Sequence, residues 1–256
     1  MALDIGDWSW AWVLYHAGVW ALVLARILGL CLTAPALAIP ELDWRFRLGL
    51  AAILGTVLMP VLAPLIVPPV AWPGTAQALL SELLTGGILG WSAALIVAGA
   101  RLAGELVAAQ AGLSTATLLD PETGDELAPL GRLYGWIALA MFLAMGGPLA
   151  LVRALVESYD AVPAGRLLIS HETAMLAFAQ VGRALALALQ AAAPPALALI
   201  LAGIVVGWLS RAAPSLPFVA LALPIRSFLG LVLVLLSLST LAVTLSGAWG
   251  TLPWGR

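Results

Sequence analysis

The sequence predicts an all-α membrane protein built from several long apolar helices. Three observations support this fold class: 63% of the 256 residues are hydrophobic, only 9% are charged, and the mean hydropathy is +1.08. A soluble domain is closer to about 45–50% apolar and about 25% charged. The charges in this chain are therefore too few to cover a soluble surface, and we expect a polytopic, membrane-type protein.

Apolar runs of spanning length recur along the chain. About 20 apolar residues cross a hydrocarbon core of roughly 30 Å. The runs predict about six helical segments, near 11–39, 48–67, 83–100, 133–152, 173–209 and 218–249. The third segment is expected to continue as a helix past Arg101, and Pro194-Pro195 would kink or break the fifth. Short connections rich in Pro and Gly separate the segments, which favours helical hairpins.

The third segment carries a ridge of small residues. Every fourth position is Ala or Gly, at Ala100, Gly104, Ala108, Gly112 and Ala116. Small side chains let two helix backbones approach closely, so this ridge predicts helix–helix packing. Arg101 and Glu105 are four residues apart and can pair on one face of the same helix.

A polar stretch follows the ridge. Ser114, Thr115 and Thr117 lead into Asp120-Pro121, and acidic residues come soon after. Non-helical backbone at membrane depth is tolerated only where protein buries it or where it lines an aqueous cavity. The residues alone leave two interpretations open: an extramembrane connection, or a segment folded into a pore.

Several polar side chains interrupt the apolar runs. Arg26, Arg183 and Arg226 would each cost ~2.5–3.5 kcal/mol at the centre of a bilayer. Glu172, Gln180, Arg183 and Gln190 fall near one face of a helix. The favoured interpretation is that these groups satisfy one another, or nearby carbonyls, inside a helix bundle. The alternative is that they face a water-filled cavity or a partner subunit.

Little in the sequence indicates catalysis. The two histidines, His16 and His171, do not form a metal-binding spacing, and the single Cys31 has no partner within the chain. The absence of lysine excludes a Walker-type phosphate loop. We therefore expect no enzymatic activity, no metal and no cofactor. The net charge of −2 gives no indication of a nucleic-acid partner.

Four blocks of the chain resemble the FliR/SctT family, the flagellar and injectisome T component of the type III secretion export apparatus. They are "ARILGLCLTAPALAIPELDWRFRLGLA", "AGELVAAQAGLSTATLLDPETG", "VESYDAVPAG" and "GWLSRAAPSLPFVALALPIRSFLGL". The blocks reach from about residue 26 to residue 231 and occur in the family's order. The chain departs from the family pattern at Gly146-Gly147-Pro148 and at Ser215-Leu216-Pro217. The string before the Asp-Pro loop lacks the arginine that is frequent in injectisome members, which favours the flagellar form.

The resemblance implies an architecture and a set of partners. Residues 1–172 would correspond to a FliP-like helical part that contains a pore loop at 110–124, and residues 173–256 to a FliQ-like helical hairpin. The subunit would complete a helical ring with FliP-like and FliQ-like export-gate subunits. It would contact an FlhB-like switch protein, an FlhA-like export component and membrane lipid, in the bacterial inner membrane within a flagellar basal body or injectisome. Unfolded secreted proteins would pass through the centre.

The resemblance also assigns candidate site residues. The pore or plug loop would contain Gln110, Gly112, Leu113, Ser114, Thr115, Thr117, Asp120, Pro121 and Gly124. Buried polar or inter-subunit contacts would involve Arg26, Arg45, Arg101, Glu105, Gln180, Arg183, Arg211 and Arg226. Two other functions remain open from the residues: a secondary transporter or small-solute permease with a polar site at the midplane, and a scaffold that does not contact a pore.

Overall fold

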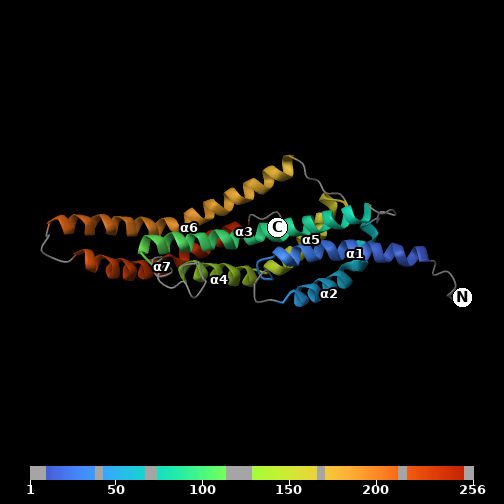
Figure 1. Ribbon diagram of the computed structural model, residues 1–256, viewed down its shortest axis with the longest axis horizontal. Coiled ribbons are helices and arrows are strands. Elements are labelled where there is room, and N and C mark those ends of the chain that lie inside the picture. Colours follow the sequence, from blue (N-terminus) through green and yellow to red (C-terminus); the bar gives the residue numbers. More distant parts are fainter. Residues whose placement is uncertain are drawn as a thin grey trace. The chain divides into compact units, whose positions relative to one another are not determined.

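The structure is a computed structural model that describes residues 10–37, 43–66, 74–113, 129–165, 171–212 and 218–250. Every regular element in these ranges is a helix (Figure 1), which confirms the predicted all-α fold class. The elements are α1 (Trp10–Thr33), α2 (Trp44–Leu62), the 3₁₀ helix η1 (Ala63–Leu65), α3 (Gly74–Ala111), α4 (Pro129–Ala144), α5 (Gly147–Ala161), α6 (His171–Ala212) and α7 (Phe218–Gly250).

The helices are long enough and apolar enough to span a membrane. Five of them in the described residues meet this condition, and α4 with α5 would count as a sixth if they form one broken span. The expectation of about six apolar segments is therefore confirmed. At 1.5 Å per residue, the 38 residues of α3 extend about 57 Å and the 42 residues of α6 about 63 Å. Both lengths exceed the roughly 30 Å hydrocarbon core, so part of each helix lies outside it.

The fourth apolar run, predicted as a single segment at 133–152, is two helices in the structure. The break falls at Gly146, whose φ of 75° is in the left-handed region that favours glycine. Pro148 then lies in the first turn of α5, where its missing N–H leaves no helical hydrogen bond unmade. The residues Gly146-Gly147-Pro148, which depart from the family pattern, thus form the junction between α4 and α5.

The residues form two compact units. Unit 1 contains Met1–Ala94 and Gly146–Ala177, and unit 2 contains Leu95–Met145 and Phe178–Arg256. Both α3 and α6 contribute to each unit. The predicted division into a FliP-like part and a FliQ-like hairpin concerns likeness to partner subunits, and it stays a prediction.

In unit 1, glycines allow α1 and α3 to cross in close contact. A Cβ atom added at Gly29 would collide with the backbone of Leu83, and one added at Gly86 would collide with the backbone of Arg26. The hydroxyl of Thr33 donates a hydrogen bond of 2.8 Å from α1 to the carbonyl oxygen of Gly87 in α3. These contacts position Arg26 against α3, and α2 packs beside α1 in the same unit (Figure 1).

In unit 2, α4 packs against both α3 and α7. Gly104 of α3 lies so close to α4 that an added Cβ would be 2.8 Å from the Cα of Gly131. Tyr134 and Ser237 join α4 to α7 through a hydrogen bond of 3.1 Å between their buried hydroxyls. The ridge predicted from small residues therefore packs as expected at Gly104, with Ala100 and Ala108 fully buried.

The two prolines at 194 and 195 do not break α6. The helix continues through both of them, from His171 to Ala212. Neighbouring helices and local adjustment of the backbone can satisfy the carbonyl groups that a proline leaves free in a membrane helix. Of the two outcomes predicted for these prolines, the break is therefore wrong, and a kink stays a prediction.

Candidate functional site

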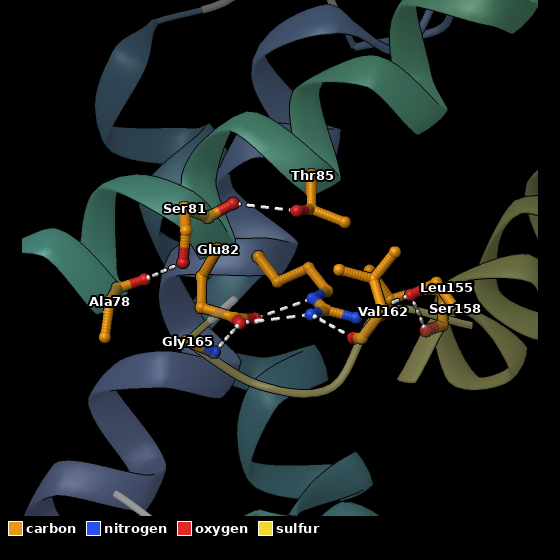
Figure 2. Close-up of polar contacts among 9 residues, drawn as sticks. Ala78, Ser81, Glu82, Thr85, Leu155, Ser158, Val162 and Gly165 are labelled. Atoms are coloured by element: carbon orange, nitrogen blue, oxygen red, sulfur yellow. Dashed lines mark hydrogen bonds and ion pairs between the residues drawn. The ribbon is translucent and has the colours of Figure 1, made fainter. Parts of the chain in front are cut away.

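Arg26 lies at the centre of a buried polar cluster in unit 1, although an apolar run surrounds it in the sequence. Its side chain is 0% exposed and forms a two-pronged ion pair with Glu82, which is 1% exposed. Arg26 Nε lies 2.6 Å from Glu82 Oε2, and Arg26 Nη2 lies 3.0 Å from Glu82 Oε1 (Figure 2). This geometry joins α1 to α3 across 56 positions of sequence.

The junction after α5 completes the cluster. Arg26 Nη1 donates to the hydroxyl of Ser158 at 2.9 Å, and Arg26 Nη2 donates to the carbonyl oxygen of Val162 at 3.0 Å. The backbone N–H of Gly165 donates to Glu82 Oε1 at 2.8 Å (Figure 2). The ring of Tyr159 stacks on the guanidinium, with 3.7 Å between Arg26 Cζ and the ring centroid. One ion pair thus fastens three segments together.

These contacts explain why the charges of Arg26 and Glu82 can be buried in this apolar unit. Burying an ion pair is tolerated when the geometry is good and further hydrogen bonds satisfy the remaining donors and acceptors. Arg26 and Glu82 meet that condition through Ser158, Val162 and Gly165. The cluster offers no reactive group to a substrate, so its physical role is to hold α1, α3 and the end of α5 in one arrangement.

The sequence identified Arg26 as a candidate but missed its partners. Glu82 lies before the third predicted run, so it did not count as an intramembrane charge. The sequence assigned no role to Ser158, Tyr159 and Gly165, which appeared only as part of the family-like block "VESYDAVPAG". The available signal was the requirement that a buried guanidinium find a carboxylate, which Glu82 could have supplied.

A second set of contacts, in unit 2, lies at the C-terminal end of α3, where the predicted pore segment begins. Gly112 has a φ of 75°, and its N–H donates to the carbonyl oxygen of Ala109 at 3.3 Å. The N–H of Leu113 donates to the carbonyl oxygen of Ala108 at 3.0 Å. This pair of hydrogen bonds around a left-handed glycine is a Schellman cap, which ends the helix at a defined point.

Helix α7 contacts the last turn of α3 beside this cap. Arg226 Nη2 donates to Gln110 Oε1 at 3.2 Å, and the hydroxyl of Ser227 donates to the carbonyl oxygen of Ala111 at 3.2 Å. Gly230 permits this approach, because a Cβ there would lie 2.5 Å from the Cβ of Ala111. Two predicted site residues from separate groups, Gln110 and Arg226, are thus in direct contact.

The start of α4 also packs against α3, seven to eleven residues before Gly112. Arg101 and Glu105 form no ion pair with each other among the contacts of the described chain. Their side chains lie over α4 instead: a Cβ at Gly135 would be 2.6 Å from Arg101 Nε, and one at Gly131 would be 2.8 Å from Glu105 Cγ. The described residues on either side of segment 114–128 therefore both pack within unit 2.

The remaining candidates are more exposed or fall outside the described ranges. Arg45, Arg183 and Arg211 have exposed side chains on this chain, and Gln180 is half-buried. The residues of the predicted loop that lie outside the described residues are Ser114, Thr115, Thr117, Asp120, Pro121 and Gly124. No group of three or more metal-ligating side chains gathers in the part of the chain that the structure describes.

Large apolar side chains cover the outer faces of several helices. On α6, Phe178 is 73% exposed and Trp208 is 75% exposed. On α2 and α7, Val57 and Val243 are among the exposed residues. A soluble monomer rarely exposes contiguous apolar surface of this kind, so lipid or other protein must cover it.

These features together define a polytopic membrane protein with a buried Arg26–Glu82 ion pair that is satisfied within the chain. The sequence profile of the family described as "Bacterial export proteins, family 1" matches residues 17–252. The chain belongs to this family, to which the flagellar FliR proteins and their injectisome counterparts are assigned.

Named relatives agree with this assignment. The chain is 32% identical to the flagellar biosynthetic protein FliR of Pectobacterium carotovorum over 208 residues, which cover 80% of this chain and 78% of the relative. It is 31% identical to the FliR protein of Escherichia coli K12 over 212 residues, covering 82% and 80%. It is 30% identical to the Yop proteins translocation protein T of Yersinia pestis over 157 residues, or 60% of each chain.

The predicted family and the predicted class of protein are therefore confirmed. The chain is a component of a type III export apparatus in the bacterial inner membrane, and it has other subunits of that apparatus as partners. The family is one of structural export components. Family membership does not favour the alternative of a secondary transporter.

Proposed function

We propose that the chain is a structural and gating subunit of a type III export gate, of the flagellar kind, and that residues 110–124 line or plug the channel for unfolded substrate proteins. The proposed partners are FliP-like and FliQ-like subunits, an FlhB-like switch protein and an FlhA-like export component. The first 172 residues then correspond to a FliP-like part, and residues 173–256 to a FliQ-like hairpin.

The observation that carries the proposal is the packing, within unit 2, of the described residues on either side of segment 114–128. On one side, the Gly112 cap ends α3 and α7 contacts its last turn through Gln110 and Ala111. On the other side, Leu130 and Gly131 pack against Gly104. A polar connection between two packed helix ends of an apolar chain suits a pore constriction, because polar backbone at membrane depth needs a protein or aqueous environment.

Two properties of the helices support a role inside an assembly. The exposed apolar faces of α2, α6 and α7 need to be covered, and partner helices can do so. α3 and α6, at about 57 and 63 Å, are also too long for lipid alone to surround them. Buried Arg26 is satisfied within the chain, so the inter-subunit contacts would involve more exposed side chains such as Arg183 and Arg211.

The test is the conductance of the assembled complex in a planar bilayer. We expect deletion of Ser114–Leu118 to raise the resting leak of small solutes, since it shortens the segment but leaves the Gly112 cap intact. The matched control deletes five residues from another connection, Pro68–Trp72. Equal conductance of the Ser114–Leu118 deletion and the unaltered complex, with assembly intact, would contradict the plug role.

A further inference from the structure

We propose that Arg226 and Ser227 of α7 are positioning residues that fix the last turn of α3 and thereby set the resting conductance of the export gate. Only the effect on resting conductance rests on the proposed function. The positioning of the last turn of α3 concerns residues that the structure describes on both sides of the contact.

The contact is made by one face of α7 and involves three positions. Arg226 reaches the side chain of Gln110, and Ser227 reaches the carbonyl oxygen of Ala111, both at 3.2 Å. Gly230, one turn further along α7, removes the side chain that would otherwise separate α7 from Ala111. Ala111 is fully buried.

The chemistry of a helix C-terminus explains why these residue types suit this place. The last carbonyl groups of a helix lack intrahelical partners and together carry a partial negative charge. The Schellman cap satisfies the carbonyl groups of Ala108 and Ala109, and Ser227 satisfies that of Ala111. The guanidinium of Arg226 supplies a positive charge beside the same end of α3, which the helix dipole favours.

The hydrogen bonding of Arg226 at this contact is also incomplete within the described residues, so a change at position 110 can strengthen or weaken the contact. Arg226 Nε is buried and has no hydrogen-bond partner among the residues that the structure describes. The partner that Arg226 does have, Gln110, is a neutral amide and not a carboxylate. A hydrogen bond from a cation to a neutral acceptor is weaker than an ion pair of the Arg26–Glu82 kind. We therefore expect the strength of the contact to change in both directions with the charge at position 110.

The experiment measures amide hydrogen exchange of peptides that cover Gln110–Leu113, together with resting conductance, in the full assembled complex. Arg226→Leu and Ser227→Ala should each speed exchange at these amides, by about tenfold for Arg226→Leu, and both should raise the leak. Arg226→Lys should retain most of the protection, because Lys keeps the charge and a donor. Gln110→Glu should slow exchange below that of the unaltered chain, which a residue that only fills space would not produce.

Matched controls are Arg153→Leu, an exposed arginine in unit 1, and Ser239→Ala, an exposed serine of α7 whose hydroxyl bonds within its own helix. Exchange at Gln110–Leu113 that is the same in Arg226→Leu and Arg153→Leu overturns the positioning claim. If the Ser114–Leu118 deletion leaks but Arg226→Leu does not, the link to conductance is wrong while the proposed function stands. If the deletion itself does not leak, the proposed function is wrong, and exchange alone decides the positioning claim.

Discussion

Replacing Glu82 by Gln tests the buried cluster of unit 1 with the smallest change of shape. Glutamine keeps one oxygen that can accept from Arg26 and from the N–H of Gly165, but the second oxygen becomes an NH₂ donor. One N–H of the fully buried Arg26 then faces another donor, and its positive charge has lost the opposite charge. We therefore expect a large loss of stability from the replacement of one carboxylate oxygen by an NH₂ group.

The structure allows the size of the loss to be worked out. Breaking a buried ion pair by neutralising one partner costs about 3–5 kcal/mol. For a chain of 150–250 residues, about 1 kcal/mol lowers the melting temperature by roughly 2–4 °C, so Glu82→Gln should lower it by roughly 6–20 °C. The measurement is thermal unfolding of the purified assembly in detergent, with Glu157→Gln, an exposed carboxylate of α5, as the control.

A double-mutant cycle separates the ion pair from its surroundings. Arg26→Leu combined with Glu82→Leu removes both charges and leaves the carbonyl of Val162 and the N–H of Gly165 without these partners. Each unsatisfied backbone group costs about 1–3 kcal/mol, which well-packed apolar side chains offset in part. The double variant should therefore lose several kcal/mol less than the sum of the two single variants. Single variants with the same melting temperature as the unaltered protein would refute this reasoning. So would a double variant whose loss of stability equals the sum of the two single losses within about 0.5 kcal/mol.

Two further predictions concern the same unit. Gly29→Ala should destabilise the assembly by about 1–3 kcal/mol, because the new Cβ collides with the backbone of α3; Gly49→Ala meets no atom within 4 Å and should be neutral or stabilising by up to about 1 kcal/mol. Equal melting temperatures for these two variants would contradict the close crossing of α1 and α3. Tyr159→Phe should leave the melting temperature unchanged or raised, because its buried hydroxyl has no partner in the described structure while the ring stacks on Arg26. A drop of several degrees would mean that the hydroxyl makes a contact of its own.

The sequence predicted the fold class and most helices because composition and apolar run length decide both. The 63% of hydrophobic residues made a membrane protein the simplest interpretation, and α3, α6 and α7 begin and end at or beyond the predicted bounds. α1 begins near its predicted start but ends at Thr33, before the predicted end at residue 39. Local signals were less reliable. Pro194-Pro195 was expected to break or kink α6 and does not break it, whereas Met145 and Gly146 separate two helices within a run that looked continuous.

The polar contacts were harder to predict because their partners lie far apart in the chain. Arg26 pairs with a residue 56 positions away and with others more than 130 positions away. A hydropathy profile contains no information about which carboxylate meets which guanidinium. The four family-like blocks did mark the right regions, and the structure joins them in two pairs.

The first pair is the block around Arg26 with the block "VESYDAVPAG", which meet in the buried cluster. The second pair is the block that contains Gln110 and Gly112 with the block that contains Arg226, Ser227 and Gly230, which meet at the end of α3. No block alone shows which other block it contacts. Their pairing gives a physical reason for the residue types: a guanidinium needs acceptors, and close helix contacts need glycine.

The most direct test of the central claim is a photocrosslink from the end of α3 to a protein in transit. A photoreactive residue replaces Leu113, the last described residue before segment 114–128, and an export substrate is stalled in the complex. A second site at Ile53, an exposed apolar position of α2, serves as the control. The account predicts that position 113 crosslinks to the stalled substrate and that position 53 does not. Crosslinks from position 113 only to lipid or to partner subunits, while the substrate is shown to be engaged, would contradict a channel-lining role.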